Sequence, residues 1–248
     1  MAIYFISDLH LNETDLNSTD LFLNFLHKYG QTAEAIYILG DFFGAWIGDN
    51  YNTPFIQTIK DVLAALYVKD IPVFFMRGNR DFLIGKNFFK STNCIAIPDP
   101  YLISLRDTKV LLTHGDLLTP VDIGFRCFSA FVKNPVTKFL FLHLPKELRL
   151  SIARYLRSNS GNVYKRKIQK DPNIFAVAQD IVASYVTKYG VSSMIHGHIH
   201  LPGVHEFTIG NGVYKRYVLG DWNKSAKILV YENGKFELLE IWSNINAK

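Results

Sequence analysis

Polar residues of the kinds that bind metal ions recur in five short clusters along the chain. Each cluster directly follows a run of apolar residues. The clusters are Asp8-Leu9-His10, Gly40-Asp41, Gly78-Asn79-Arg80-Asp81, His114-Gly115-Asp116 and His196-Gly197-His198-Ile199-His200. Oxygen and imidazole donors without thiolate suit divalent ions such as Mn²⁺, Fe²⁺ or Zn²⁺. Two such ions about 3.5–4 Å apart can bind phosphoryl oxygens and activate water.

Spacing within the clusters supports a shared site, because residues two apart point to the same side of an extended backbone. A lone Asp-x-His or Gly-Asp after a strand is more often a turn or a helix cap than a ligand. Five clusters in order, each at a strand end, favour the metal site over that alternative. His196 is expected to face away from the site, and His27, His143 and His205 are expected to be packing or surface residues.

Two kinds of apolar pattern predict a mixed α/β fold. Short apolar runs predict strands buried on both faces, at 2–7, 35–39, 71–76, 110–113 and 193–195. Helical spacing of apolar residues predicts helices at 21–29, 56–66 and 178–186. Four further strands follow near the end of the chain, at 205–209, 214–219, 226–231 and 236–242. Carboxyl ends of strands in such a sheet share one edge, so the five clusters are expected to converge there.

Composition limits the class of protein. The 248 residues are 48% hydrophobic, which is enough for one core plus an insertion. No stretch approaches the roughly 20 apolar residues of a membrane-spanning helix, and the N-terminus lacks a signal-peptide pattern. The two cysteines, Cys94 and Cys127, are far apart in sequence, which fits free thiols in a reducing compartment. We therefore expect a cytoplasmic protein.

Positive charge concentrates in residues 121–170. This segment holds eleven basic and two acidic residues, a net charge of +9, whereas the whole chain carries +5 and the remainder therefore −4. Aromatic and aliphatic residues are interleaved with the cations, and Pro135 and Pro145 divide the segment into about three short helices. We interpret it as a lid whose inner face takes acyl chains and whose cations meet phosphate and an anionic bilayer. The alternative is an ordinary helical hairpin with a solvated basic face.

The order of the motifs closely resembles the calcineurin-like metallophosphoesterase superfamily. Five segments are similar to the UDP-2,3-diacylglucosamine hydrolases of the lipid A pathway, namely Phe5–Leu11 (FISDLHL), Gly40–Asp49 (GDFFGAWIGD), Arg77–Leu83 (RGNRDFL), His114–Asp116 and Ile195–His200 (IHGHIH). Arg80 is the more specific feature, because the superfamily usually has histidine there. The resemblance implies a four-layer α/β/β/α sandwich formed by residues 1–120 and 171–248, with residues 121–170 inserted as a helical lid.

The resemblance also implies two divalent metal ions, with Mn²⁺ as the expected metal. One ion would be held by Asp8, His10, Asp41 and His200, and the second by Asp41, Asn79, His114 and His198. Catalytic roles would fall on Asn79, Arg80 and His114. Contacts to phosphate and glucosamine would be made by Asn79, Arg80, Asp122, Ser160, Lys167 and His198. The chain departs from the family pattern at Gly44, Asn50, Tyr164 and Leu201.

The implied reaction hydrolyses the pyrophosphate of UDP-2,3-diacylglucosamine to UMP and 2,3-diacylglucosamine 1-phosphate. The enzyme would bind peripherally to the cytoplasmic face of the inner membrane. Arg80 suits a phosphate because its fork binds two oxygens and stays charged.

Alternative functions remain within the same superfamily. Another dinuclear-metal phosphodiesterase or a nuclease would share the metal site, and a nuclease would also explain the basic segment. The segment is, however, too apolar for a groove that tracks phosphates, and no second domain suited to gripping DNA is evident. A non-catalytic scaffold would have lost ligands, whereas this chain keeps every donor. Neither nucleic acid nor an obligate protein partner is expected.

Overall fold

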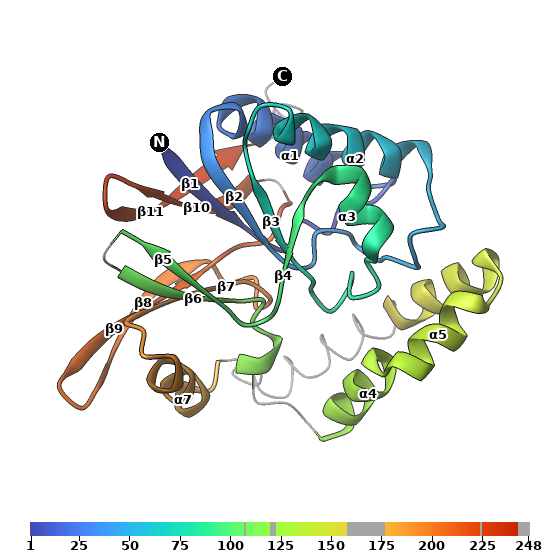
Figure 1. Ribbon diagram of the computed structural model, residues 1–248. Helices are drawn as coiled ribbons and strands as arrows, with labels where there is room; N and C mark the ends of the chain where they lie inside the picture. The colour runs from blue at the N-terminus through green and yellow to red at the C-terminus, as the bar shows by residue number, and fades with distance from the viewer. Residues whose placement is uncertain (107, 120–122, 158–176, 224, 243–248) are drawn as a thin grey trace.

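Two β-sheets stack face to face, with helices on both outer faces (Figure 1). The computed structural model describes residues 1–106, 108–119, 123–157, 177–223 and 225–242. The first sheet has the order β11 (Lys235–Trp242), β10 (Ser225–Glu232), β1 (Ala2–Ile6), β2 (Ala33–Leu39), β3 (Val73–Met76) and β4 (Ile95–Ile97). The second has the order β5 (Tyr101–Leu105), β6 (Thr108–Thr113), β7 (Ser193–His196), β9 (Gly212–Val218) and β8 (Gly203–Ile209).

Helices complete a four-layer α/β/β/α sandwich. The first sheet is covered by α1 (Leu16–Lys28), α2 (Pro54–Tyr67) and α3 (Lys86–Thr92), and the second by α7 (Gln179–Tyr189) (Figure 1). Short 3₁₀ turns occur at η1 (Gly30–Thr32) and η2 (Asp116–Leu118). Three apolar clusters fill the spaces between the layers. The predicted layer architecture is therefore confirmed.

Strand β1 shows why its sequence is apolar throughout. Tyr4 and Ile6 pack toward the helices, whereas Ile3 and Phe5 pack toward the second sheet. A strand buried on both faces cannot alternate between apolar and polar residues. Strands β1, β2 and β3 run parallel, as do β6 and β7, so the polar clusters that follow them reach the same edge of the sandwich.

Three short elements were not predicted from the sequence. Strands β4 and β5 and helix α3 lie among residues 86–105. Strand β4 has only three residues, of which Ile95 and Ala96 are exposed, so its apolar signal is weak. Helix α3 has seven residues and begins after Gly85, which offers no side chain to cap it. Its cap comes from a residue distant in the sequence.

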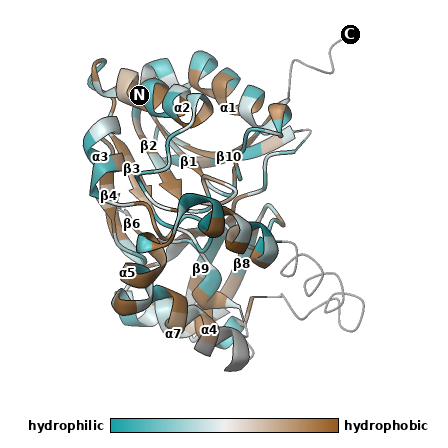
Figure 2. Cartoon of the chain, turned by 90° about the vertical axis from the view of Figure 1, so that its right-hand side faces the viewer, coloured by the Kyte–Doolittle hydropathy of each residue, from teal (hydrophilic) through white to brown (hydrophobic). Residues whose placement is uncertain are grey.

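Helices of the predicted lid lie beside the sandwich and form none of its layers (Figures 1 and 2). They are α4 (Ile123–Lys133), α5 (Pro135–His143) and a helical stretch at 146–157. Pro135 is the first residue of α5 and Pro145 directly precedes the third helix, as expected. Figure 2 shows apolar residues on α4 and α5 among hydrophilic ones. None of the described helices has the length and apolar character needed to cross a bilayer.

The cations of the lid are not all exposed to solvent, and Arg149 is buried. Its side chain is only 1% exposed, and Nη1 donates to the carbonyl oxygen of Ile47 at 2.5 Å and to Oδ1 of Asn50 at 3.0 Å. Lys138 also faces the core, with Nζ 5.4 Å from the centre of the Phe82 ring. Sequence composition counts these residues with the solvated cations because it cannot separate exposed from docked side chains.

Asp49 ties three segments together. Its Oδ2 accepts from the backbone N–H groups of Asn87 and Phe88 at 2.9 and 3.1 Å, which caps the start of α3. Oδ1 accepts from the backbone of Gly85 at 2.9 Å and from Nε1 of Trp46 at 3.0 Å. A carboxylate at a helix N-terminus is stabilised by unpaired N–H groups and by the helix dipole.

We predict that Asp49→Ala lowers the free energy of unfolding by about 2 kcal/mol, because four donors lose a charged acceptor. Urea denaturation measures the effect. Asp61→Ala is the matched control, since Asp61 is exposed on α2 and accepts from Nε2 of Gln57; its effect should stay within about 0.5 kcal/mol. Equal losses in the two variants would contradict the role of Asp49.

Candidate metal centre

Loops from both sheets meet at one edge of the sandwich. The N–H of Asp8 donates to the carbonyl of Gly40 at 3.1 Å, which aligns the loops after β1 and β2. The N–H of Gly197 donates to the carbonyl of His114 at 3.0 Å, which aligns the loops after β6 and β7. The N–H of His198 then donates to Oδ2 of Asp8 at 2.8 Å and joins the two sheets. The expected convergence of the strand-end clusters is therefore observed.

One half of the centre contains Asp8, His10 and His200, whose potential ligand atoms all lie within 4.8 Å of one another. Nε2 of His10 is 3.3 Å from Nε2 of His200, and the latter atom is 3.4 Å from Oδ1 of Asp8. That oxygen is buried and has no hydrogen-bond partner among the described residues. A buried carboxylate oxygen facing two imidazole nitrogens fits a cation, which would occupy the shared space between them.

The other half contains Asp41, Asn79 and His114. Asp8, Asp41 and His114 again place ligand atoms within 4.8 Å of one another, with Nε2 of His114 3.6 Å from Oδ1 of Asp41. Nδ1 of His114 lies 2.9 Å from the carbonyl oxygen of Leu39, so a proton on Nδ1 leaves the lone pair of Nε2 facing the centre. The His198 ring stands edge-on to the His114 ring, with 5.0 Å between centroids.

The side-chain amide of Asn79 can face the centre in two orientations, which suit different states of the centre. With its oxygen inward, Oδ1 lies 2.9 Å from Nε2 of His114 and faces only acceptors. With its nitrogen inward, the amide would donate to Oδ2 of Asp41 at 2.8 Å. The nitrogen-inward orientation suits the centre without a cation, and the oxygen-inward orientation supplies one more ligand atom to a cation.

Electrostatics also mark the centre as a site for positive charge. Burial raises the pKa of Asp41 to about 7, and the charges of Asp81 and Asp8 add to the rise while His114 opposes it. Burial alone would lower the pKa of His114, but Asp41 and Asp8 raise it to about 9. Burial would raise the pKa of Asp8, yet the nearby histidines, led by His200, lower it overall. Protons and metal ions must therefore compete for the same groups.

The backbone is strained at the same residues. Asp8, His10, Asp41, His198 and His200 all have positive φ angles, between 51° and 71°. Residues other than glycine seldom adopt this left-handed backbone conformation. Such strain concentrates at functional sites, where the surrounding structure enforces it. Nothing in the sequence pattern predicted this strain.

Two aspartates support the candidate ligands without belonging to the predicted set. Asp81 is buried, and its carboxylate accepts from the N–H groups of Gly78 at 2.6 Å and Phe42 at 2.8 Å, which holds two ligand-bearing loops together. Asp221 places Oδ2 3.6 Å from Nδ1 of His200. Asp81 lies within a recognised motif, whereas no motif signals Asp221.

Gly78 is required by close packing. A side chain there would run into the carboxylate of Asp41, although the backbone of Gly78 itself has no positive φ. The glycine therefore lets the loop after β3 approach the centre, as its place in the motif suggests.

A cavity of about 240 Å³ opens beside the first half of the centre. Its walls include His10, His200, Arg80 and Arg157, and the N–H of Arg80 donates to Oδ1 of Asp41 at 2.8 Å. A side chain at Gly44 would meet the flexible end of Arg157, so the glycine lets the guanidinium lie close to the backbone there. Sequence reasoning counted Arg157 only as a lid cation.

The remaining predicted residues divide into two groups. Asp122, Ser160, Tyr164 and Lys167 lie outside the described residues. His196 faces away from the centre, as expected, with Nε2 3.1 Å from Nη1 of Arg216. The three histidines assigned to packing or surface positions are exposed, namely His27, His143 and His205.

Comparison with known proteins shows the family to which the chain belongs. Residues 1–202 match the family model described as calcineurin-like phosphoesterase, and the chain belongs to this family. The chain is 41% identical over 236 residues to the UDP-2,3-diacylglucosamine hydrolase of Pseudomonas fluorescens (strain SBW25), covering 95% of this chain and 94% of that relative. It is 39% identical over 242 residues to the protein of the same name from Stenotrophomonas maltophilia (strain K279a), covering 96% and 98%. A solved archaeal phosphodiesterase aligns over 98% of this chain and 99% of its own, with 13% identity and a TM-score of 0.49.

We predict that Asp221→Asn weakens Mn²⁺ binding by about 10- to 100-fold, because the ring of His200 loses the charged partner that orients it. Calorimetric titration of the metal-free protein measures the affinity. Asp61→Asn removes one exposed carboxylate on α2 and should leave the affinity unchanged. If Asp221→Asn binds Mn²⁺ as tightly as the unmodified chain, Asp221 does not orient His200.

Proposed function

We propose that the protein hydrolyses the pyrophosphate bond of UDP-2,3-diacylglucosamine and releases UMP and 2,3-diacylglucosamine 1-phosphate. The observation that carries this proposal is the centre around Asp41, where buried acceptors converge beside Arg80 in a cavity. Similarity over nearly the whole chain to relatives with the corresponding name supports the choice of substrate.

Two divalent ions, with Mn²⁺ as the proposed metal, fit the donor set. Asp8, His10, Asp41 and His200 would hold one, and Asp41, Asn79, His114 and His198 would hold the other, as the sequence motifs imply. When bound, the ions would draw charge from phosphate oxygens and make water a better nucleophile.

The chain's own residues bind and orient the phosphates. Arg80 and Arg157 line the cavity beside the centre, and a guanidinium can bind two phosphate oxygens at once. The backbone of Arg80 is fixed because its N–H donates to Asp41 and its carbonyl accepts from Trp46 at 3.1 Å. A fixed arginine can hold the phosphate in line for attack, which we place at the α-phosphorus. Asn79 and His114 complete the catalytic set.

The lid is proposed to bind the acylated glucosamine. Asp122, Ser160, Lys167 and His198 would contact its polar part. The acyl chains would lie against inward residues of the lid helices. Phe141 is half-buried and suits that role, whereas Phe139 is 60% exposed and packs against His143. Residues two apart on a helix point to different sides, so Phe139 and Phe141 do not face the same surface of α5.

An exposed apolar stripe on α5 supports peripheral attachment to a membrane. Val136, Phe139 and Leu140 lie at helical spacing and are each 60–66% exposed, with Lys146 and Arg154 exposed farther along the lid. Apolar insertion combined with cationic attraction is how proteins bind anionic bilayer surfaces. We place this surface against the cytoplasmic face of the inner membrane.

The proposed reaction predicts Mn²⁺-dependent release of UMP from UDP-2,3-diacylglucosamine. Asp41→Ala should lower this rate by about a thousandfold or more, because both ions lose a ligand. Asp61→Ala is the control with an equal change of charge. Faster cleavage of single-stranded DNA or of a simple phosphodiester than of the lipid substrate would favour the alternative of a nuclease or general phosphodiesterase.

A second prediction concerns Arg80. We expect Arg80→Lys to lower kcat/KM for the lipid substrate by about tenfold or more, because an ammonium group keeps the charge but not the two-pronged contact. Arg154→Lys, at an exposed position of the lid, should leave the rate unchanged. A rate for Arg80→Lys within about twofold of the unmodified enzyme would mean that Arg80 supplies only general positive charge.

The membrane surface gives a third prediction. Replacing Val136, Phe139 and Leu140 together by serine should weaken sedimentation with anionic vesicles while the melting temperature stays the same, because these side chains are exposed. The control replaces Tyr67 and Val68 by serine, because these residues are 58% and 81% exposed at the end of α2. Equal vesicle binding by the two variants would rule out the α5 stripe as the attachment surface.

A further inference from the structure

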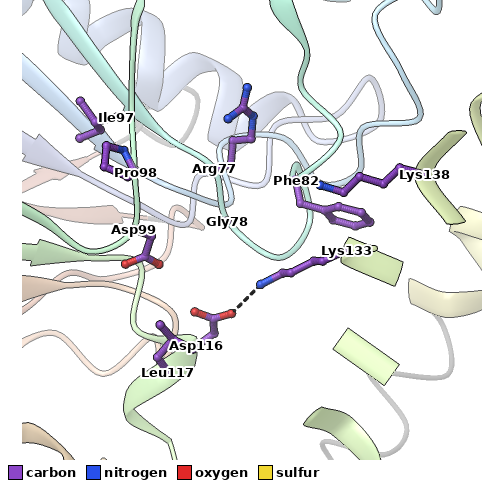
Figure 3. Close-up of a pocket in the computed structure, with 10 residues that line it drawn as sticks. All are labelled: Arg77, Gly78, Phe82, Ile97, Pro98, Asp99, Asp116, Leu117, Lys133 and Lys138. Atoms are coloured by element: carbon purple, nitrogen blue, oxygen red, sulfur yellow. Dashed lines mark hydrogen bonds and ion pairs between the residues drawn. The ribbon is translucent and has the colours of Figure 1, made fainter. Parts of the chain in front are cut away.

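A second cavity of about 250 Å³ lies between the lid helices and the core (Figure 3). Lys133 of α4 and Lys138 of α5 reach into it from one side, and Phe82, Asp99 and Leu117 line it from the core. Among the described residues, this cavity shares no wall with the one that contains Arg80. It is also smaller than the roughly 300–1,000 Å³ of typical pockets for whole ligands, which suits one part of a larger substrate.

This second cavity adjoins the half of the metal centre that the first cavity does not. Gly78 lines it and directly precedes Asn79. Asp116 lines it two residues after His114, and Oδ2 of Asp99 accepts from the N–H of His114 at 3.2 Å. The first cavity is instead lined by Asp8, His10 and His200. The two cavities therefore adjoin different halves of the centre, and a pyrophosphate diester has two different substituents to place.

The walls of the second cavity combine flat, acidic and basic groups. Phe82 and Leu117 supply apolar surface, and Oδ1 of Asp99 is buried without a hydrogen-bond partner among the described residues. Nζ of Lys133 lies 3.2 Å from Oδ2 of Asp116, and Nζ of Lys138 lies over the Phe82 ring. Figure 3 shows the carboxylates of Asp99 and Asp116 on one side of the cavity and the Phe82 ring on the other.

An acyl chain does not suit these walls, because it would keep water from the carboxylates without replacing its hydrogen bonds. A nucleoside suits them better. Its base offers a flat face to Phe82, its ribose hydroxyls can donate to aspartate oxygens, and its phosphate can extend to the adjoining half of the metal centre.

We propose that this cavity binds the uridine half of the substrate, with the ribose at Asp99 and Asp116, the base against Phe82 and the α-phosphate directed toward the adjoining half of the metal centre. The inference rests on the proposed function, which supplies the uridine. The diacylglucosamine half would then occupy the side of Arg80 and Arg157.

Filling the cavity provides the test. Leu117→Trp enlarges a half-exposed leucine at the cavity wall, and Leu102→Trp makes the same change on β5, at a leucine of similar exposure. The inhibition constants of UMP and of inorganic phosphate are measured against hydrolysis of bis(4-nitrophenyl) phosphate. The ratio of the two constants isolates the contribution of the nucleoside from that of the metal-binding phosphate.

We expect Leu117→Trp to reduce the advantage of UMP over phosphate by about tenfold, which equals about 1.4 kcal/mol, and Leu102→Trp to leave it unchanged. Phe82→Leu, which removes the stacking face without filling the cavity, should reduce it as well and decides the matter if Leu117→Trp does not fold. An unchanged ratio in the folded cavity variants would overturn the proposal. The proposal would also be overturned if the cavity variants bound 2,3-diacylglucosamine 1-phosphate more weakly while their binding of UMP stayed the same.

Failure of the proposed function gives a different result. An unmodified enzyme that hydrolyses the small diester but not UDP-2,3-diacylglucosamine would contradict that function. The ratio of UMP to phosphate inhibition would still show whether the cavity binds the nucleoside.

Discussion

The burial of two carboxylates side by side is the constraint on which the rest of the structure depends. Asp8 and Asp41 are almost inaccessible to solvent, and Asp81 adds a third buried carboxylate nearby. Like charges in a low-dielectric setting repel strongly unless positive charge lies between them. A space suited to cations lies between these groups. The histidines and the amide of Asn79 surround it, and the strained backbone at five of the candidate ligands holds their side chains toward it. Asp81 accepts hydrogen bonds from the backbone of two ligand-bearing loops, and Asp221 lies at ion-pair distance from His200; both contacts help to hold the acceptors in place.

The lid helices pack against the core beside this centre. The lid helices contact the core through charged side chains, with Lys133 of α4 on Asp116 and Arg149 of the helix at 146–157 buried at the carbonyl of Ile47. We propose that the core supplies chemistry common to the family, while residues carried by the lid select the substrate. Two cavities adjoining different halves of one centre extend this division to the two arms of a pyrophosphate diester.

Much of the core and the candidate ligands could be predicted because one strong signal defines both. Strands buried on both faces are apolar throughout, and the polar residue that ends each run marks the shared edge. The signal fails for short or remote features. Strand β4 is brief and partly exposed, and α3 takes its cap from Asp49, which lies 36 residues before Gly85, the residue that precedes the helix. Asp221 follows no recognisable motif, and composition cannot show that Arg149 is buried. These features depend on contacts between distant segments.

The central claim is that the acceptors around Asp41 hold two divalent ions. Titration of the metal-free chain with Mn²⁺, followed by calorimetry, tests it most directly because it requires no substrate. Two ions per chain are expected, and Asp41→Ala should weaken both, since the sequence motifs assign this residue to both ions. Binding of a single ion, or two-ion binding that is unaffected by Asp41→Ala, would contradict the account.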